Sequence, residues 1–163
     1  MFKIYPVLKT YFFHSTLIFS FVLLLSFAAD TTTADTANGG LAEDVLKYTN
    51  EFRKSKVLKT LEMRSDLNTI ARRHSEDMAG GRCGFGHEGY NLRVSKVRKI
   101  IKPCEGFVGE NVAYGARTGK AAFDIWKNSS GHRKNMLGDY KYIGIGIASN
   151  RRGIIYYTQL FVR

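Results

Sequence analysis

The C-terminal end of the chain contains two short segments rich in isoleucine, tyrosine and other strand-forming residues. They cover residues 143–149 and 154–162 and are separated by the sequence Asn-Arg-Arg-Gly. β-Branched and aromatic runs on either side of a short glycine-containing turn predict a β-hairpin. Upstream of the hairpin the chain shows helical periodicity and no alternation of strands with helices. The pattern therefore favours an α+β domain in which helices pack on a mostly antiparallel sheet.

Four earlier segments have apolar residues at helical spacing and predict helices over residues 42–56, 66–79, 92–102 and 120–127. Ser65 and Asn91 precede the second and third segments, where a short polar side chain can cap a helix. His74 falls on the apolar face of the second helix, where a histidine is more often packed and hydrogen-bonded than a ligand. In the fourth helix we expect a buried face of Ala121, Ala122, Ile125 and Trp126.

Residues 1–28 have the features of a signal peptide. Lys3 and Lys9 precede an uncharged apolar run that ends in small residues. This order predicts cleavage near Ala28 and export to the periplasm, the cell surface or the medium. The alternative is an uncleaved membrane anchor, because residues 11–29 approach the roughly 20 residues that a membrane span needs.

The sequence that follows this segment predicts a single domain. Residues 29–40 are rich in Thr, Ala, Asn and Gly and predict a flexible leader. Residues 41–163 are enough for one domain with its own core and too few for two. We expect this domain to be monomeric.

The chain is strongly basic. Removing residues 1–28 takes away two lysines and no acid, so the net charge falls from +11 to +9. Such a charge favours contact with an anionic surface such as membrane headgroups or acidic polysaccharide, and the plainer alternative is a soluble basic secreted protein. No aromatic side chains are interleaved among the densest cations, and an exported protein does not ordinarily meet nucleic acid, so nucleic acid is not an expected partner. Those cations are Arg93, Lys96, Arg98, Lys99 and Lys102.

Two cysteines, Cys83 and Cys104, follow the export segment. The oxidising conditions outside the cytosol favour a disulfide between them. Closing a loop of about 20 residues would stabilise the fold by about 3 kcal/mol in the chain-entropy model. The alternative is that Cys83 binds a metal ion together with His87.

Three polar side chains are candidates for a common site. His87 lies in a glycine-rich loop, Glu110 lies between apolar residues, and His132 follows the fourth predicted helix. A buried carboxylate needs a partner or takes up a proton, and the plainer alternative is that Glu110 only accepts backbone hydrogen bonds. Two histidines and a carboxylate can bind Zn²⁺ through the imidazoles and leave room for water. Spacing alone does not show that the three side chains meet.

Several sequence blocks resemble the signature of a known family. They read GHEGYN at 86–91, GENVAYG at 109–115 and WKNSSGHRKNML at 126–137, which leads into IGIGIA at 143–148. In this order they resemble the CAP superfamily, which includes cysteine-rich secretory proteins, venom antigens, plant pathogenesis-related proteins and many bacterial exported proteins. The resemblance extends over residues 41–163.

The resemblance implies an α-β-α sandwich around a central antiparallel sheet, with a groove that carries His87, Glu110 and His132. It further implies Zn²⁺ held by His87 and His132, or a small-molecule or lipid ligand. Ser129 stands where animal-type members have a second glutamate, as bacterial-type members tend to. A cation at this site would therefore have one anionic partner instead of two.

These residues leave three functions open. The first is a non-enzymatic ligand-binding domain with Ser129 in the groove. The second is a hydrolase, either metal-assisted or with Ser129 as nucleophile, His132 as base and Glu110 as the orienting acid. Against that triad, Ser129 is predicted to be an N-cap whose hydroxyl accepts the amide of His132, and such a hydroxyl is a poor nucleophile. The third is a polar network with a purely structural role.

Overall fold

The computed structural model describes residues 38–102 and 107–163. The predicted signal peptide, its cleavage near Ala28, most of the predicted leader and Cys104 lie outside these residues. No helix within the described residues is long and apolar enough to cross a membrane. Residues 38–54 are helical, so the first helix begins within the predicted leader and includes residues 38–40.

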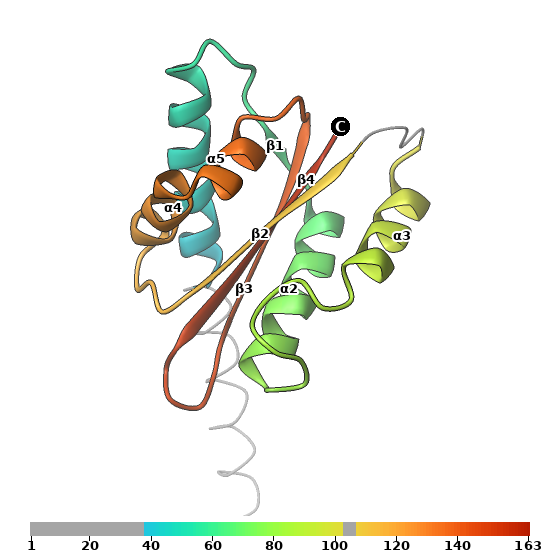
Figure 1. The fold of residues 1–163 in the computed structure, drawn as a ribbon, viewed down its shortest axis with the longest axis vertical. Coiled ribbons are helices and arrows are strands. Elements are labelled where there is room, and N and C mark those ends of the chain that lie inside the picture. Colours follow the sequence, from blue (N-terminus) through green and yellow to red (C-terminus); the bar gives the residue numbers. More distant parts are fainter. Residues whose placement is uncertain (1–37, 103–106) are drawn as a thin grey trace, which may run out of the picture. The chain divides into compact units, whose positions relative to one another are not determined.

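The described elements form a four-stranded sheet with helices on both faces (Figure 1). The strands are β1 (Glu62–Met63), β2 (Val108–Tyr114), β3 (Tyr142–Ser149) and β4 (Ile155–Val162), and their order in the sheet is β1-β3-β4-β2. All pairs are antiparallel except the short parallel pair of β1 with β3. The sheet thus confirms the predicted α+β sandwich. It differs from the predicted antiparallel sheet only in that the edge strand β1 is parallel to β3.

The predicted hairpin is confirmed as β3 and β4, in the register Tyr142↔Val162 to Ser149↔Ile155. The side chain of Asn150 closes the turn, because its Oδ1 accepts hydrogen bonds from the backbone amides of Arg152 (2.9 Å) and Ile154 (3.0 Å). Gly153 has a φ of 73°, a conformation that glycine adopts without steric cost.

Each face of the sheet has its own hydrophobic core. On one face, α2 (Ser65–Ala79) and α3 (Tyr90–Ile100) pack over Leu160 and Val162. On the other face, the helix at 38–54, α4 (Gly119–Asn128) and α5 (Ser130–Met136) form a core with the strands, which includes Trp126 of α4 and Phe161 of β4. The two layers of helices lie on opposite sides of the strands in Figure 1.

Two glycines of β3 let α2 approach the sheet closely. A Cβ at Gly146 would lie 2.0 Å from the backbone nitrogen of Arg72, and one at Gly144 would lie 2.5 Å from the carbonyl carbon of Leu67. Neither position has room for a side chain. The alternation of isoleucine and glycine in this strand therefore places isoleucine in one core and the backbone of α2 against the other face.

Three details of the predicted helices are wrong. α2 begins at Ser65 itself, and its N-cap residue Arg64 makes no side-chain capping bond. α3 begins at Tyr90 with Gly89 as N-cap, so Asn91 lies inside the helix. Ile125 is 45% exposed, whereas Trp126 is fully buried as predicted.

Strand β2 forms one edge of the sheet, and side chains cover its outward-facing carbonyl oxygens. The carbonyl of Val108 accepts a hydrogen bond from the Tyr90 hydroxyl. The carbonyl of Glu110 accepts one from the Asn135 amide (3.0 Å), and the carbonyl of Val112 accepts one from the Trp126 indole (3.0 Å). These bonds tie α3, α4 and α5 to the same strand.

Candidate functional site

Strand β2 carries Glu110 on the sheet face that α3 covers. The side chain of Glu110 is only 2% exposed, and both of its oxygens bind the guanidinium of Arg93. Arg93 Nε lies 2.6 Å from Oε2, and Nη2 lies 2.7 Å from Oε1. The predicted buried carboxylate is confirmed, and the alternative that it accepts only backbone hydrogen bonds is wrong.

His87 is bound to the same carboxylate. Its Nδ1 lies 2.8 Å from Glu110 Oε1, and half of its side chain is exposed. Because the carboxylate that Arg93 stabilises can only accept, Nδ1 must be the donor. In the neutral imidazole the lone pair is then on Nε2, which leaves that nitrogen available to a ligand or a metal ion.

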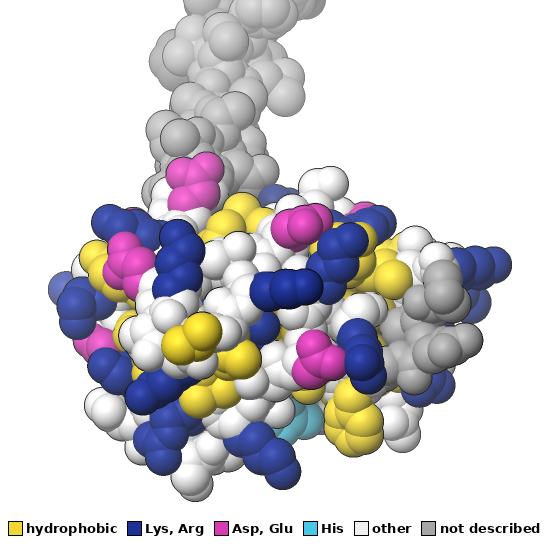
Figure 2. Space-filling view, turned by 90° about the horizontal axis from the view of Figure 1, so that it is seen from above, with side chains coloured by type: hydrophobic (Ala, Val, Ile, Leu, Met, Phe, Trp, Pro, Cys, Tyr) yellow, Lys and Arg dark blue, Asp and Glu magenta, His cyan; other side chains and the backbone are white. Residues whose placement is uncertain are grey.

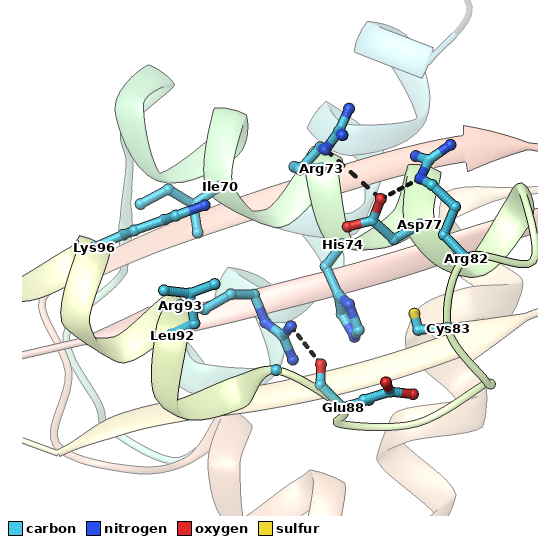
Figure 3. Close-up of a pocket in the computed structure, with 11 residues that line it drawn as sticks. Ile70, Arg73, His74, Asp77, Arg82, Cys83, Glu88, Leu92, Arg93 and Lys96 are labelled. Atoms are coloured by element: carbon cyan, nitrogen blue, oxygen red, sulfur yellow. Dashed lines mark hydrogen bonds and ion pairs between the residues drawn. The ribbon is translucent and has the colours of Figure 1, made fainter.

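The loop around His87 is held by hydrogen bonds to its backbone. Arg93 Nη1 donates to the carbonyl of Glu88 (2.7 Å), the bond drawn in Figure 3. His74 Nε2 lies 2.8 Å from the carbonyl of Gly86. Burial holds the pKa of His74 below its usual value, so the neutral ring donates to this carbonyl. His74 is therefore a packed, hydrogen-bonded histidine, as its position on the apolar face of α2 predicts.

His132 lies on α5 and approaches the site from the opposite side of the sheet. Burial lowers its pKa, and the charge of His87 lowers it further. Nδ1 of His132 is buried and has no hydrogen-bond partner among the described residues. A neutral ring with an unpaired buried nitrogen is suited to receive a ligand.

Two asparagines hold the start of α5 against β2. Asn111 Nδ2 donates to the backbone carbonyl of His132 (3.1 Å) and to Gln159 Oε1 (3.1 Å). Asn135 Nδ2 donates to Asn111 Oδ1 (2.9 Å) as well as to the strand. The backbone that carries His132 is thereby fixed relative to the strand that carries Glu110.

Ser129 is the N-cap residue of α5, but its hydroxyl accepts no capping hydrogen bond, so that part of the prediction is wrong. The hydroxyl does not donate to Nδ1 of His132, because that atom has no partner within the described residues. The carboxylate of Glu110 contacts His87. The contacts of a Ser129–His132–Glu110 relay are thus not formed in this arrangement.

A hollow of about 260 Å³ lies next to the His87–Glu110 pair. Neither Ser129 nor His132 is among the residues that line it. Phe107, which is 82% exposed, gives the hollow an open aromatic side. The lining residues are His87, Tyr90, Phe107, Val108, Gly109, Glu110 and Asn135.

The described residues contain no group of three or more His, Cys, Asp or Glu side chains that could hold a metal ion. The donors that fit the predicted Zn²⁺ are the two imidazoles, since His87 Nε2 is available and His132 Nδ1 is unpaired. Both oxygens of Glu110 are already bound. Zn²⁺ bound here would act as a Lewis acid, held by neutral imidazoles, with Glu110 orienting His87.

Cys83 has no disulfide partner among the described residues, and burial raises the pKa of its thiol. Its predicted partner Cys104 lies outside the described residues, so the disulfide stays a prediction.

Sequence reasoning missed Arg93 and the two asparagines. Arg93 was counted only as one of the densest cations of the chain, although it is four residues before the buried Val97 and so shares its helix face. The four-residue spacing between Arg93 and Val97 could therefore have indicated that Arg93 is buried. Asn111 and Asn135 lie inside the blocks GENVAYG and GHRKNML, in which only Glu110 and His132 were considered as site residues.

Comparison with known proteins places these residues in context. A protein described as "Uncharacterized membrane protein YlbC" from Bacillus subtilis (strain 168) is 36% identical over 129 residues, which are 74% of this chain and 34% of that protein. "Uncharacterized protein YkwD" from the same organism is 31% identical over 134 residues, 81% of this chain and 51% of that protein. The chain thus spans between a third and about half the length of these relatives.

A solved structure has the same fold. An extracellular protein containing a SCP domain from Bacillus anthracis superposes with a TM-score of 0.66 and 29% identity, over 77% of this chain and 41% of that one. Residues 46–161 match the CAP family, described as the cysteine-rich secretory protein family. This match covers more than half of the sequence, and the sandwich fold agrees with it, so the chain belongs to the CAP family.

Proposed function

We propose that this chain is an exported CAP domain whose groove binds a ligand at His87, with Glu110, His132 and Ser129 around it, and that it is not a hydrolase. The observation that carries the proposal is the 2.8 Å contact of His87 Nδ1 with a buried carboxylate, which fixes a half-exposed imidazole beside an open hollow. A fixed imidazole with a free Nε2 is suited to bind an ion or a polar ligand group.

The chemistry of the hollow suggests a ligand with two parts. A polar group, or a Zn²⁺ ion shared with His132, fits at the imidazole of His87. The exposed ring of Phe107 and the side chain of Val108 offer apolar contact to the rest of a small molecule or lipid. Hydrolysis is the weaker candidate, because Ser129 does not donate to His132 Nδ1 and because the only carboxylate among the predicted site residues is bound to Arg93.

Export is part of the proposal. It rests on the signal-peptide pattern in residues 1–28 and on the extracellular description of the Bacillus anthracis relative. The description of YlbC as a membrane protein makes an uncleaved anchor the alternative. In either case the domain would lie outside the cytosol, where Cys83 and Cys104 could form the predicted disulfide.

Zn²⁺ titration by calorimetry tests the ion site. After chelator treatment, the native protein should bind Zn²⁺, and the variant His87→Ala with His132→Ala should lose at least about tenfold in affinity. Glu88→Gln is the matched control, since it removes an exposed acid from the same loop and should leave the affinity unchanged. Elemental analysis of the purified protein shows whether the metal is carried in its native state.

The same variants separate the three functions. If the network is purely structural, the double histidine variant melts at a much lower temperature and the native protein does not respond to chelator. If the protein is a hydrolase, the native protein cleaves ester or peptide substrates and the double variant does not. Equal Zn²⁺ affinity in the native protein and the double variant would rule out the ion site.

A further inference from the structure

The outward face of α3 carries an unpaired positive charge. Lys96, Arg98 and Lys99 on the helix, and Lys102 just after it, are all exposed. The sequence from Gly89 to Lys102 contains no acidic residue. Within the described part of the chain, none of these four cations forms an ion pair, whereas the fifth cation of the stretch, Arg93, is buried against Glu110.

The neighbouring helix α2 is different, because its arginines are balanced by acids. Arg72 pairs with Glu76 at 3.0 Å, and Arg73 lies 3.6 Å from Asp77. Arg82, in the loop after α2, pairs with Asp77 at 2.6 Å. Figure 3 shows the pairs of Arg73 and Arg82 beside a hollow of about 280 Å³ between the two helices, with no partner drawn for Lys96. On the sheet face that α2 and α3 cover, the cations without an acidic partner among the described residues are therefore those of α3.

Two apolar side chains are exposed on the same helix. Leu92 is 62% exposed and Ile100 is 41% exposed. Leu92 and Lys96 are four residues apart and line the open hollow between α3 and α2, and Lys99 is exposed three residues further along the helix. Lys and Arg side chains spread over other parts of the surface too, as Figure 2 shows.

We propose that the outward face of α3 docks on an anionic phospholipid surface. Phosphate headgroups match the four cations, and the boundary between headgroups and acyl chains accepts Leu92 and Ile100. An acidic polysaccharide would satisfy the charges but gives no reason for exposed leucine and isoleucine side chains.

Sedimentation with lipid vesicles tests this surface in the full chain. Protein should bind vesicles of mixed phosphatidylcholine and phosphatidylglycerol more strongly than vesicles of phosphatidylcholine alone. Each cation near an anionic surface contributes about fivefold to partitioning, so the variant Lys96→Gln with Lys99→Gln should bind roughly 25-fold more weakly. Because the apolar segment near the N-terminus is the same in every variant, differences between variants report on α3.

Two further variants make the result specific. Arg151→Gln with Arg152→Gln removes the same charge from an exposed turn and should change binding by less than about twofold, since it lies outside the docking face. Leu92→Ser with Ile100→Ser keeps every charge and should bind the anionic vesicles several-fold more weakly. Thermal melts confirm that each variant folds.

Three results would overturn the proposal. The α3 and turn variants could lose binding equally, which would indicate a general effect of net charge. The serine variant could bind as tightly as the native protein, which would remove the role of the apolar residues. The native protein could fail to bind anionic vesicles but bind a heparin column through Lys96 and Lys99, which would indicate a polyanion as partner.

Discussion

Two arginine–carboxylate pairs of equal length lie in different surroundings in this domain. Arg93 Nε is 2.6 Å from Glu110 Oε2, and Arg82 Nε is 2.6 Å from Asp77 Oδ1. The side chains of the first pair are 9% and 2% exposed, whereas those of the second are 51% and 30% exposed. The distance between the charges is the same, so any difference in their energetic effect comes from water.

Water screens the Arg82–Asp77 pair and solvates either partner when the other is removed. The Arg93–Glu110 pair has little water, and its guanidinium also donates to the carbonyl of Glu88. Removing one partner there leaves a charge and several polar groups without compensation. Burial and shared hydrogen bonds, not ion-pair length, therefore identify the pair on which the site depends.

The largest effect is expected from Arg93→Met. This change leaves the buried carboxylate of Glu110 unpaired and should lower the free energy of unfolding by about 3–5 kcal/mol. Urea denaturation followed by circular dichroism measures the loss. The double variant Arg93→Met with Glu110→Leu is the control, and it should recover most of the stability because no buried charge remains. A loss below about 1 kcal/mol in the single variant would contradict this view of the pair.

An intermediate effect is expected from pH, through His74, which lies between the two pairs. Burial is the main cause of its lowered pKa; Arg93 lowers the pKa further, whereas the bond to Gly86, Glu110 and Asp77 raise it. The unfolded chain takes up a proton near pH 6.5, but folded His74 does so only at lower pH. The free energy of unfolding should therefore fall as the pH drops below about 6.5, until the pH passes the folded pKa.

His74→Gln keeps a donor for the carbonyl of Gly86 and cannot take up this proton. Urea denaturation at several pH values between 5 and 8 should give a flatter pH dependence for this variant than for the native protein. The difference should be smaller than the loss caused by Arg93→Met. Parallel curves for the two proteins would show that His74 does not contribute to the slope.

The smallest effect is expected from Arg82→Gln. This change removes the exposed partner of Asp77, and surface pairs contribute about 0–1 kcal/mol, so the free energy of unfolding should change by less than about 1 kcal/mol. Added salt should reduce the difference between the variant and the native protein. A loss comparable to that of Arg93→Met would mean that ion-pair length matters more than burial.

Much of the fold follows from local patterns. The hairpin is predicted by strand-forming runs on both sides of a turn, and the burial of His74 by its helix position. The contact between His87 and Glu110 does not follow from local patterns, because the spacing of residues along the chain does not show which distant segments meet. Only the resemblance of the sequence blocks around them to the CAP family placed the two residues in one groove.

The missed features depend on contacts between distant segments. Arg93 looked like one more cation in a basic helix, and its burial requires β2 to lie beneath α3. Ser65 and Asn91 have side chains suited to capping, but the observed N-cap residues are Arg64, one residue before Ser65, and Gly89, two residues before Asn91. Ile125 follows helical periodicity, yet it is 45% exposed.

Strand β2 has a further consequence for how copies of this domain meet one another. An unpaired edge strand is a template on which a second chain can add a strand and begin an aggregate. Here an incoming strand would find the acceptors of Val108, Glu110 and Val112 taken by Tyr90, Asn135 and Trp126. It would have to displace a phenol, an amide and an indole, all three of which come from the sequence blocks that resemble the family signature. The side chains that assemble the groove therefore also protect the protein from polymerising along its own sheet.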